Sequence, residues 1–515
     1  MSSSSSGESF RHLLNKPWKT FLFPTIKSDH FYLFLKLGLA ISIIFLISHF
    51  FYLSISYQKP QIHYNPLSLK QMFLSEIPKT LPPTPSPPQD PILTNLSHIV
   101  FGIGGTYSTW ENRRHYSELW WNPNVTRGFV WLDTAPLKNE TWPETSPPYK
   151  VSANTSSFKY TCDYGSRSAI RIARILKETF NLGLDNVRWF VMGDDDTVFF
   201  PENLITVLNK YDHNQLYYIG GNSESVEQNV VHFYTMGYGG GGFAISYPLA
   251  AELVMILDGC IDRYADLYGS DQKIQSCISE IGVQITKEPG FHQIDVHGSP
   301  YGLLAAHPVA PLVSLHHLDY VEQFYPDMDR IDSLKKLLTA YKADPGRTIQ
   351  PSFCYDHTRN WTVSISWGYS VELYPYFPTA KDLETPYLTF KTWKSWSDGP
   401  FTLNTRPISW DICRRPLIYF LDQIDVEQEK TQSNYKRYPS PIHYECERAD
   451  YVQPLKIQYV NVSAPKFSAS LWNKAPRRQC CEVINDSDSQ VINGSDSLIQ
   501  VNVRACQPFE SVTPH

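Results

Sequence analysis

The chain has 515 residues, which is more than one small hydrophobic core can organise, so we expect two folded domains with appended segments. Its formal net charge is −6 and its pI is near 6.2. This balance gives no support to nucleic-acid binding, because such proteins carry strongly basic surfaces, and we expect no nucleic-acid partner.

The first strong signal is an apolar segment of nineteen residues, 37–55. As a helix it would span about 28 Å, close to the hydrocarbon thickness of a bilayer. Several basic residues precede it and few follow: the preceding ones are Arg11, Lys16, Lys19, Lys27 and Lys36. The positive-inside rule then predicts a cytosolic tail over residues 1–36, a single-pass signal anchor over 37–57 and a luminal remainder.

Cysteines and glycosylation signals agree with that orientation. All nine cysteines follow the apolar segment, as an oxidising lumen allows, and their odd number leaves at least one thiol free or intermolecular. The Asn-x-Ser/Thr sequons also follow it, starting at Asn95, Asn124, Asn139, Asn154, Asn360, Asn461, Asn485 and Asn493. Residues 58–94 contain nine prolines, which predicts an extended stem between the anchor and the folded part.

Folded structure is expected to begin with a short apolar strand at residues 98–101, a glycine-rich turn at 102–105 and a helix over 110–120. Backbone N–H groups at such a turn favour anions. The glycine pattern is not the dinucleotide fingerprint and is weak by itself. We take Thr106 and Arg114 as candidate nucleotide-binding residues.

A second helix is predicted over residues 166–180, where apolar residues recur at helical spacing. Its basic residues, Arg167, Arg171, Arg174 and Lys177, are expected largely on the opposite face, most simply in contact with solvent. With the next strand at residues 128–133, the alternation of strands and helices predicts an α/β sheet with both faces covered.

The most informative stretch ends a buried strand, residues 189–192, with three consecutive carboxylates, Asp194, Asp195 and Asp196. Ligands of open α/β sheets collect beyond the carboxyl ends of strands. Neighbouring carboxylates repel by roughly 1 to 4 kcal/mol per close pair, which a hard divalent cation would relieve. A solvated acidic turn is the simpler alternative, but apolar residues on both sides favour a Mn²⁺ or Mg²⁺ site that carries a diphosphate.

Further elements are predicted along the chain: a helix at 202–211, a strand at 217–221 and helices at 248–257 and from about 270. Glycine lets a ligand approach the backbone, so Gly240 and Gly241 could form a substrate wall; a mobile loop is the alternative. Ser270 or Asp271 could cap the last of these helices, which is the ordinary explanation for an Asp there.

The remaining signals lie in the second half. Residues 308–320 end with a strand that carries His316 and His317, and a helix is expected over 331–341. From there the chain changes to short strands with frequent prolines and six cysteines. We predict a β-rich, disulfide-tied module over 346–515, whose function the sequence does not reveal.

The order of these motifs resembles the Fringe and β1,3-galactosyltransferase family of inverting enzymes, glycosyltransferase family 31, and more closely its plant Fringe-related branch. The resemblance covers about residues 95–325 and rests on Trp189-Phe-x-x-x-Asp-Asp-Asp-Thr, the glycine run to Phe243, Ser270-Asp271 and Ser314-Leu-His316. Later stretches resemble the plant branch: Trp361-Thr-Val-Ser-Ile-Ser-Trp-Gly-Tyr, Asn404-Thr-Arg-Pro and Pro476-Arg-Arg-Gln-Cys-Cys. The resemblance implies an α/β fold with a GT-A-type, Rossmann-like catalytic domain over 95–345.

The resemblance also implies roles for single residues. Asp196 matches the principal metal ligand, and Asp194 and Asp195 match its neighbours around the ribose and the metal's waters. His316 matches a histidine that reaches the metal or the diphosphate, with His317 as the alternative by one position. Asp271 matches the catalytic base, although Ser270 stands where the family usually has a second acidic residue.

The implied protein is a Golgi type II membrane enzyme with a luminal catalytic domain. It would transfer a hexose, galactose or N-acetylglucosamine in β1,3 linkage, from a UDP-sugar to a glycan or glycoconjugate hydroxyl, with inversion and with Mn²⁺ or Mg²⁺ as cofactor. Two alternatives stay open: a catalytically inactive, Fringe-like sugar-binding membrane protein, and a metal-dependent hydrolase that releases free sugar without an acceptor.

Overall fold

The computed structural model describes residues 36, 38–39, 42–49, 93–440, 445–484 and 498–513. The chain divides into two compact units, Met1–Asp90 and Pro91–His515. In the first unit the described residues are helical, and the rest of the predicted tail, anchor and stem lies outside the described residues. Among the residues that the structure describes, no helix combines the length and the apolar character needed to cross a membrane.

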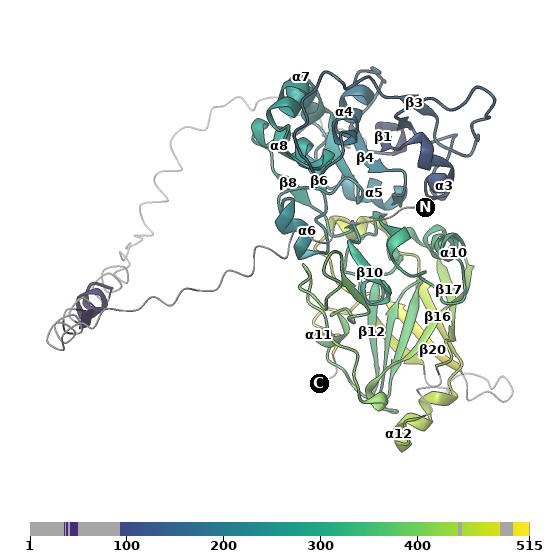
Figure 1. The fold of residues 1–515 in the computed structure, drawn as a ribbon. Helices are drawn as coiled ribbons and strands as arrows, with labels where there is room; N and C mark the ends of the chain where they lie inside the picture. The colour runs from purple at the N-terminus through teal and green to yellow at the C-terminus, as the bar shows by residue number, and fades with distance from the viewer. Residues whose placement is uncertain are drawn as a thin grey trace, which may run out of the picture. The chain divides into compact units, whose positions relative to one another are not determined.

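A mixed seven-stranded sheet organises the first half of the second unit (Figure 1). Its order is β3-β2-β1-β4-β7-β6-β8; the first four strands run parallel, and β7 runs antiparallel to both of its neighbours. β4 therefore lies at the centre, and its carboxyl end carries the aspartates. The bounds are β1 Ile99–Gly104, β2 Gly128–Leu132, β3 Tyr149–Val151, β4 Trp189–Asp194, β6 Tyr218–Gly220, β7 Phe243–Ser246 and β8 Ile285–Lys287.

Helices and loops cover both faces of this sheet, as predicted. Val100 and Phe190 pack with α4, α7 and α8, whereas the alternate residues Ile99 and Val191 face the opposite core, which contains Phe199. Alternation with period 2 sends each strand's side chains into two cores. The helices are α3 Tyr107–Glu118, α4 Ser168–Phe180, α5 Pro201–Leu208, α6 Val226–Val231, α7 Tyr247–Arg263 and α8 Ser270–Ile281.

The expectation of a solvated basic face on α4 is wrong. Arg171 is buried and donates from its two terminal nitrogens to the carbonyls of Trp131 and Gly105, at 2.9 Å each. Arg174 and Lys177 both pair with Asp258 of α7. The helix uses its basic residues to fasten the first two strands and a neighbouring helix, because the carbonyls at strand ends need donors.

Several very short strands complete the first half. β5 (Val198–Phe199), β11 (Ser314–Leu315) and β9 (Phe291–His292) form a three-stranded sheet in that order. Only β11 remains of the strand predicted within residues 308–320. β10 (Val296–Gly298) pairs with β15 (Phe390–Thr392), so a segment from the second half of the sequence joins the first half.

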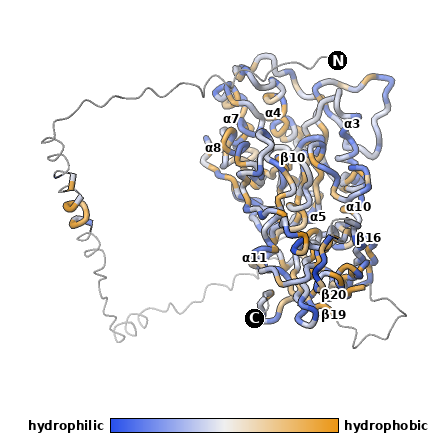
Figure 2. Tube along the Cα trace, turned by 60° about the horizontal axis from the view of Figure 1, so that its bottom comes forward, coloured by the Kyte–Doolittle hydropathy of each residue, from blue (hydrophilic) through white to orange (hydrophobic). Residues whose placement is uncertain are grey.

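The second half is built on an eight-stranded sheet, in agreement with the predicted β-rich character. β19 meets β12 through the disulfide Cys354–Cys481 and the bridge between Ser352 and Gln479, so the sheet curls until its first and last strands lie together. Figure 2 shows apolar and polar residues mixed along β16 and β20. In sheet order the strands are β12 Pro351–Asp356, β13 Trp361–Ser366, β14 Ser370–Tyr374, β16 Leu417–Val426, β17 Lys430–Arg437, β18 Tyr459–Pro465, β20 Leu498–Arg504 and β19 Cys480–Ile484.

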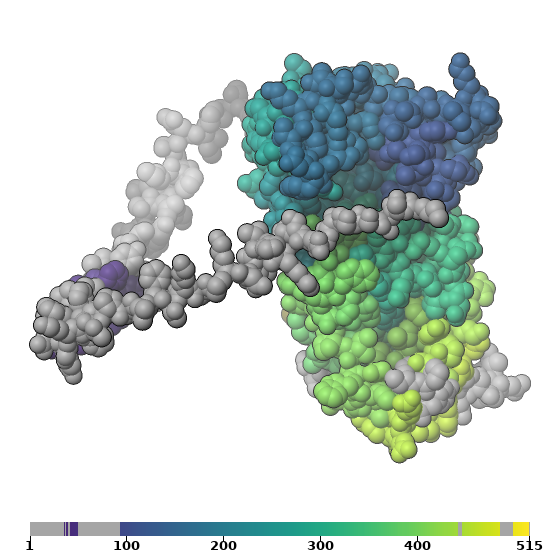
Figure 3. Space-filling view, in the orientation of Figure 1, coloured from purple at the N-terminus to yellow at the C-terminus, as the bar shows by residue number. Residues whose placement is uncertain are grey.

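The two halves pack directly on one another (Figure 3), and the remaining helices lie at this contact or within the second half. Tyr301 of α9 donates to Glu372 at 2.8 Å, and Ser366 donates to the Leu304 carbonyl at 2.7 Å. Residues 91–515 are one compact unit, so the predicted boundary at residue 345 stays a prediction. The helices are α9 Tyr301–Ala305, α10 Arg330–Ala343, α11 Ala380–Leu383 and α12 Ala449–Val452.

Four disulfides use eight of the nine cysteines. Cys260–Cys277 joins α7 to α8, and three bridges lie in the second half: Cys354–Cys481, Cys413–Cys446 and Cys480–Cys506. Cys162 is buried and free, so the odd cysteine count is explained by one reduced thiol. The module predicted to be tied by disulfides carries three of the four bridges.

Candidate functional site

The three aspartates follow the central strand directly and are fixed by the residue after them. Thr197 accepts a hydrogen bond from the backbone N–H of Asp194 at 2.9 Å and donates its own hydroxyl proton to the carbonyl of Gly240 at 2.7 Å. One buried hydroxyl therefore joins the aspartate turn to the glycine run. Sequence reasoning had given Thr197 no role, although its position after the aspartates could have suggested one.

Asp194, Asp196 and His316 form a set of ligand atoms that all lie within 4.8 Å of one another. The Nε2 atom of His316 lies 3.0 Å from a carboxylate oxygen of Asp196 and 3.9 Å from one of Asp194. Two carboxylates and an imidazole suit Mn²⁺, and carboxylates also suit Mg²⁺. The residues present therefore fit a divalent cation, and the identity of the cation is not fixed by this donor set.

Arg113 also belongs to this cluster, and Arg114 does not. Arg113 lies 3.0 Å from Asp195 and 3.4 Å from Asp196. Arg114 instead pairs along its own helix with Glu111 and Glu118. The selection of Arg114 for donor binding is thus at odds with the geometry, because neighbours on a helix point about 100° apart and only one of them can face the aspartates.

The cluster separates the pKa values of its members. Burial opposes ionisation of Asp196, but the charges of His316 and Arg113 outweigh it and hold the pKa of Asp196 below its usual range. Burial and the neighbouring charge of Asp196 raise the pKa of Asp195 to about 6. Burial alone would lower the pKa of His316, yet the Asp196 carboxylate raises it to about 9.

The predicted glycines lie against this cluster. A Cβ atom added to Gly240 would lie 2.0 Å from the imidazole of His316, so no larger residue fits there while His316 stays in place. The backbone N–H of Gly241 donates to the side-chain oxygen of Gln293 at 2.6 Å. The run is therefore held on both sides and packs as a wall, in contrast to the alternative of a mobile loop.

The turn after β1 also reaches the aspartates. A Cβ atom on Gly105 would lie 3.5 Å from a carboxylate oxygen of Asp195, and Thr106 follows as the residue that begins α3. The side chain of Thr106 makes no capping hydrogen bond, so its hydroxyl is not committed to the helix end. The strand, glycine turn and helix start predicted from the sequence thus lie on one side of the cluster, and nucleotide binding by Thr106 stays a prediction.

Asp271 lies across a small cavity from the metal-ligand set. The cavity has a volume of about 20 Å³ and is lined by Asp194, Gly239 and Asp271, among others. Asp271 accepts hydrogen bonds from the backbone N–H groups of Gln272 at 2.9 Å and Gly239 at 3.3 Å. Burial raises the pKa of this carboxyl, which brings it closer to the range in which a base works at neutral pH.

The capping role considered for Ser270 or Asp271 is wrong. The residue before α8 is Gly269, and Gln272 returns its side-chain oxygen to the N–H of Gly269 at 3.0 Å. His317 likewise does not replace His316. It has a left-handed backbone with φ of 54° and turns its Nδ1 atom to Asp295 at 2.7 Å, away from the metal-ligand set.

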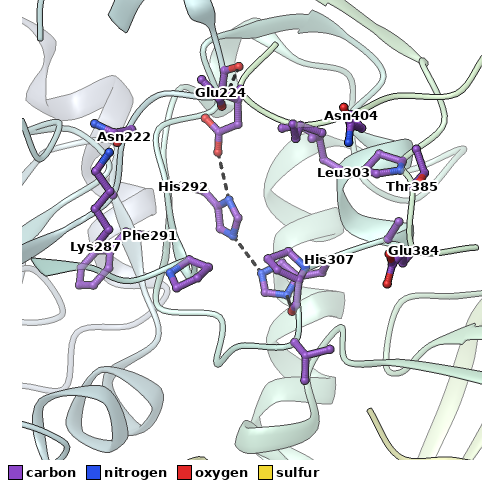
Figure 4. A pocket seen from close by; sticks show the side chains of 18 of the residues that line it. Asn222, Glu224, Lys287, Phe291, His292, Leu303, His307, Glu384, Thr385 and Asn404 are labelled. Atoms are coloured by element: carbon purple, nitrogen blue, oxygen red, sulfur yellow. Dashed lines mark hydrogen bonds and ion pairs between the residues drawn. The ribbon is translucent and has the colours of Figure 1, made fainter. Parts of the chain in front are cut away.

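A larger cavity of about 650 Å³ lies between the first half and the second (Figure 4). His292 lines it and lies between Glu224 and His307, with nitrogen contacts of 3.0 and 2.9 Å. The neighbouring Gln293 contacts the glycine run instead. No residue of the metal-ligand set lines this cavity, and sequence reasoning gave no indication of it.

The hydrogen bonds in this cavity fix how the imidazoles are protonated. The Nδ1 of His307 contacts the Pro308 carbonyl at 2.7 Å, and a carbonyl can only accept. Burial and the charge of His292 lower the pKa of His307, so His307 is neutral and its Nε2 accepts from His292. The other nitrogen of His292 faces a carboxylate oxygen of Glu224 at 3.0 Å.

An α/β sheet whose central strand ends in a divalent-cation donor set, with a buried carboxylate nearby, fits a GT-A-like domain. The Fringe-like family model matches residues 117–299, which hold the aspartates, the glycine run and Asp271. A second model, "Protein of unknown function, DUF604", matches residues 228–481, which hold His316 and most of the second half. Residues 117–299 therefore form a Fringe-like domain, and the chain's place in the plant branch stays a prediction.

Curated relatives agree with this assignment over part of the chain. A "Beta-1,3-glucosyltransferase" of Mus musculus is 26% identical over 214 residues, which is 37% of this chain and 40% of the relative. The protein of the same name from Homo sapiens is 26% identical over 171 residues, 31% of this chain and 32% of the relative. The chain thus matches less than half of either relative's length.

A solved structure was also matched, "Crystal structure of a glycosyltransferase involved in the glycosylation of the major capsid of PBCV-1". It is 12% identical, covers 46% of this chain and 96% of its own, and has a TM-score of 0.24. At that TM-score the similarity carries no argument.

Proposed function

We propose that this protein is a metal-dependent glycosyltransferase of the Golgi membrane that transfers a hexose from a UDP-sugar to a hydroxyl group of a glycan or glycoconjugate, with inversion. The observation that carries the proposal is the set of Asp194, Asp196 and His316, with Asp271 across a small cavity. The Fringe-like domain and the glucosyltransferase names of two relatives support it. Galactose, N-acetylglucosamine and glucose are the donor sugars to test first.

One group of residues would bind the cation and the donor's phosphates, and a separate residue would take up the acceptor's proton. Asp194, Asp196 and His316 would hold the cation, which, when bound, supplies Lewis-acid stabilisation of the diphosphate leaving group. Arg113 lies beside the same carboxylates and is placed to pair with donor phosphate once they bind the cation. The glycine wall and the turn before α3 allow close approach of the donor to the backbone.

Asp271 would act as the general base. Its carboxylate takes the proton of the acceptor hydroxyl while that oxygen attacks the anomeric carbon of the donor. The bond between this carbon and the diphosphate oxygen breaks, and its electron pair leaves with UDP. The products are an inverted glycoside, UDP and a proton that Asp271 later gives to water. One displacement needs no covalent enzyme intermediate.

The proposal is tested by measuring UDP release and glycoside formation by the full chain in detergent. The panel combines the three UDP-sugars with glycan and phenolic glycoside acceptors, with Mn²⁺, with Mg²⁺ and with a chelator. We expect release that requires both a divalent cation and an acceptor. Equal release without an acceptor would identify a hydrolase, and donor binding without any release would identify a sugar-binding protein.

Asp271→Asn tests the base directly. The amide cannot take up a proton, so transfer should fall by about 10²- to 10⁴-fold while donor affinity stays nearly unchanged. Ser270→Ala is the matched control, because Ser270 neither caps α8 nor offers a carboxylate. A fully active Asp271→Asn enzyme would contradict the assignment and direct attention to the Glu224–His292 pair.

A further inference from the structure

A continuous stack of aromatic rings leads away from the candidate active site. His317 stacks on Trp393 with ring centres 4.6 Å apart and planes inclined by 6°, and Trp393 stacks on His297 at 4.8 Å and 3°. His297 in turn stacks on Trp396 at 4.0 Å and 7°. Tyr320 packs against the edge of Trp393 at 4.8 Å. Four parallel rings from three segments thus form one column.

The inner end of this column touches the metal-ligand set. The rings of His316 and His317 lie 3.9 Å apart between centres, and His316 is itself 3.0 Å from Asp196. The outer end is open to solvent, because Trp396 is 62% exposed and Tyr320 is 46% exposed. Three stacking steps of 4.0 to 4.8 Å and the 3.9 Å contact between the two imidazoles separate Trp396 from His316, so only an extended acceptor can cover Trp396 and also reach the metal-ligand set.

Both tryptophans come from the second half of the sequence. They follow β15, which pairs with β10 so that Lys391 lies opposite His297 and Thr392 opposite Val296. The Fringe-like match ends at residue 299, before this loop. The segment is thus an addition by the second half to a site otherwise built by the first half.

The loop of the tryptophans is held rigidly. Glu227 of α6 accepts hydrogen bonds from the backbone N–H groups of Lys394 and Ser395 at 2.9 and 3.4 Å. Trp396 has a left-handed backbone with φ of 53°, a conformation that is unfavourable for a bulky residue and that clusters at functional sites. The loop thus presents an exposed indole in a fixed backbone conformation, so the platform is ready before a ligand binds.

We propose that Trp393, Trp396 and Tyr320 form the acceptor subsite of the enzyme and that a neutral hexopyranoside ring of the acceptor stacks on Trp396. The proposal rests on the proposed function and adds the class of acceptor and the residues that select it. A pyranose has a face of C–H bonds that packs on an aromatic ring, while its hydroxyl groups stay in water. The large, rigid, exposed indole with its amphipathic neighbour Tyr320 suits such a ligand.

The charges around the loop agree with a neutral ligand. Lys391 pairs with Asp398, and Glu227 is occupied by two backbone N–H groups. His297 uses its Nε2–H to donate to the carbonyl of Trp393 at 2.9 Å, which fixes the ring within the column. The outer rings present carbon faces to solvent, with the exposed side chain of Lys394 beside them.

Kinetics of the full chain with methyl β-glycosides of galactose and glucose oligosaccharides of increasing length as acceptor probes test the subsite, because only a longer acceptor spans the column. Trp396→Ala should raise the acceptor KM at least tenfold and leave kcat and the donor KM within about twofold, and Trp396→Phe should restore most of the affinity. Trp410→Ala is the matched control, since Trp410 is 92% exposed and enters none of the ring contacts among the described residues. An unchanged acceptor KM in Trp396→Ala would overturn the proposal.

A binding measurement without catalysis separates this proposal from the proposed function. Saturation-transfer NMR of the same glycosides should show contact with the C–H face in the wild type and in Trp410→Ala, and lose it in Trp396→Ala. Contact without any transfer would reject the enzyme and keep the sugar platform. Transfer with contact that survives Trp396→Ala would keep the enzyme and reject the platform.

The large cavity between the halves is the competing place for an acceptor, and none of the stacked rings lines it. Asn404→Ala changes a polar residue of the cavity wall that is exposed and remote from the metal-ligand set. We expect its acceptor KM to stay within twofold of the wild type. A large rise in Asn404→Ala, with none in Trp396→Ala, would move the acceptor into the cavity.

Discussion

The two halves of the folded chain both bury charged groups, but they treat them differently. In the second half, Glu372 accepts hydrogen bonds from Tyr301 at 2.8 Å and Tyr374 at 2.7 Å, and Arg406 donates to Tyr374 at 3.0 Å. Arg406 also stacks on Tyr387, with its guanidinium carbon 3.6 Å from the ring centre. Each charge there has several fixed partners.

In the first half the charges do not balance. Asp194, Asp195 and Asp196 share two cationic neighbours, Arg113 and His316. The pKa of Asp195 rises to about 6 while that of Asp196 falls below its usual range, which is how crowded carboxylates respond when partners are too few. A buried charge alone is therefore a poor indicator of chemistry in this molecule. An excess of charge of one sign next to a cavity is a better indicator of chemistry.

The largest effect is expected for Asp196→Asn, which tests whether the unbalanced carboxylates of the first half bind the cation and the donor. In the wild type, Mn²⁺ at a hundred times its Kd should stabilise the fold by about 2.7 kcal/mol. The variant should lose this metal response and bind the donor at least about a hundredfold more weakly, because changes one shell further out already cost 10–100-fold.

The melting temperature of Asp196→Asn without metal shows whether repulsion or pairing dominates at this carboxylate. Repulsion alone would make removal of a carboxylate stabilising. His316 and Arg113 both contact Asp196, however, so we expect the metal-free variant to melt at the same temperature as the wild type or lower. Thermal unfolding with and without Mn²⁺ measures both effects, and unfolding of the variant with a retained metal response would favour a purely structural role.

Arg406→Met tests whether the paired charges of the second half stabilise the fold without contributing to donor binding. Removing one partner of a buried pair leaves the other charge uncompensated, so the free energy of unfolding should fall by about 3 kcal/mol. Mn²⁺-dependent donor binding should persist in the folded fraction, because neither Arg406 nor Glu372 lines the candidate site. The double variant Glu372→Gln/Arg406→Met should recover part of the loss in denaturant unfolding; no recovery would mean that Arg406 acts through packing alone.

A third prediction compares two neighbours on α3. Arg113→Ala should weaken donor binding by roughly ten- to a hundredfold, since hydrogen bonds to charged groups contribute about 1.5–3 kcal/mol. Arg114→Ala should leave donor binding unchanged, because its partners Glu111 and Glu118 lie on its own helix. Isothermal titration with UDP and Mn²⁺ decides between them, and the opposite ranking would restore the choice made from the sequence.

This pair also shows what the sequence could and could not predict. Strand, glycine turn and aspartates are local signals, and the elements that carry Asp194 and Gly240 were expected correctly. Which arginine of α3 faces the aspartates depends on the rotation of the helix, and that is set by the packing of Trp110 and Tyr116. Adjacent residues of one type give no signal for that choice.

The aromatic column was even harder to predict from the sequence. Its rings come from residues 297, 317, 393 and 396, and they meet only because β15 pairs with β10. Strands of two or three residues, such as β11 and β15, carry no periodicity from which such a pairing could be predicted. The buried role of Arg171 was missed for a related reason, because its acceptors are the backbone carbonyls of two other segments.

The smallest expected effect concerns two sequons of the curled sheet. Asn360 is exposed in the turn between β12 and β13, with φ of 56°. Asn461 lies within β18 opposite Asn434, half-buried, and its side-chain oxygen is fully buried. In the full chain from a eukaryotic secretory pathway, we expect Asn360→Gln to remove one glycan and Asn461→Gln to remove none, because a glycan at Asn461 would have to displace its strand neighbours.

Glycopeptide mapping reads both positions, and an occupied Asn461 would show that this face of the sheet is more open than its packing indicates. A bare Asn360, together with bare Asn124 and Asn139, would contradict the predicted luminal orientation.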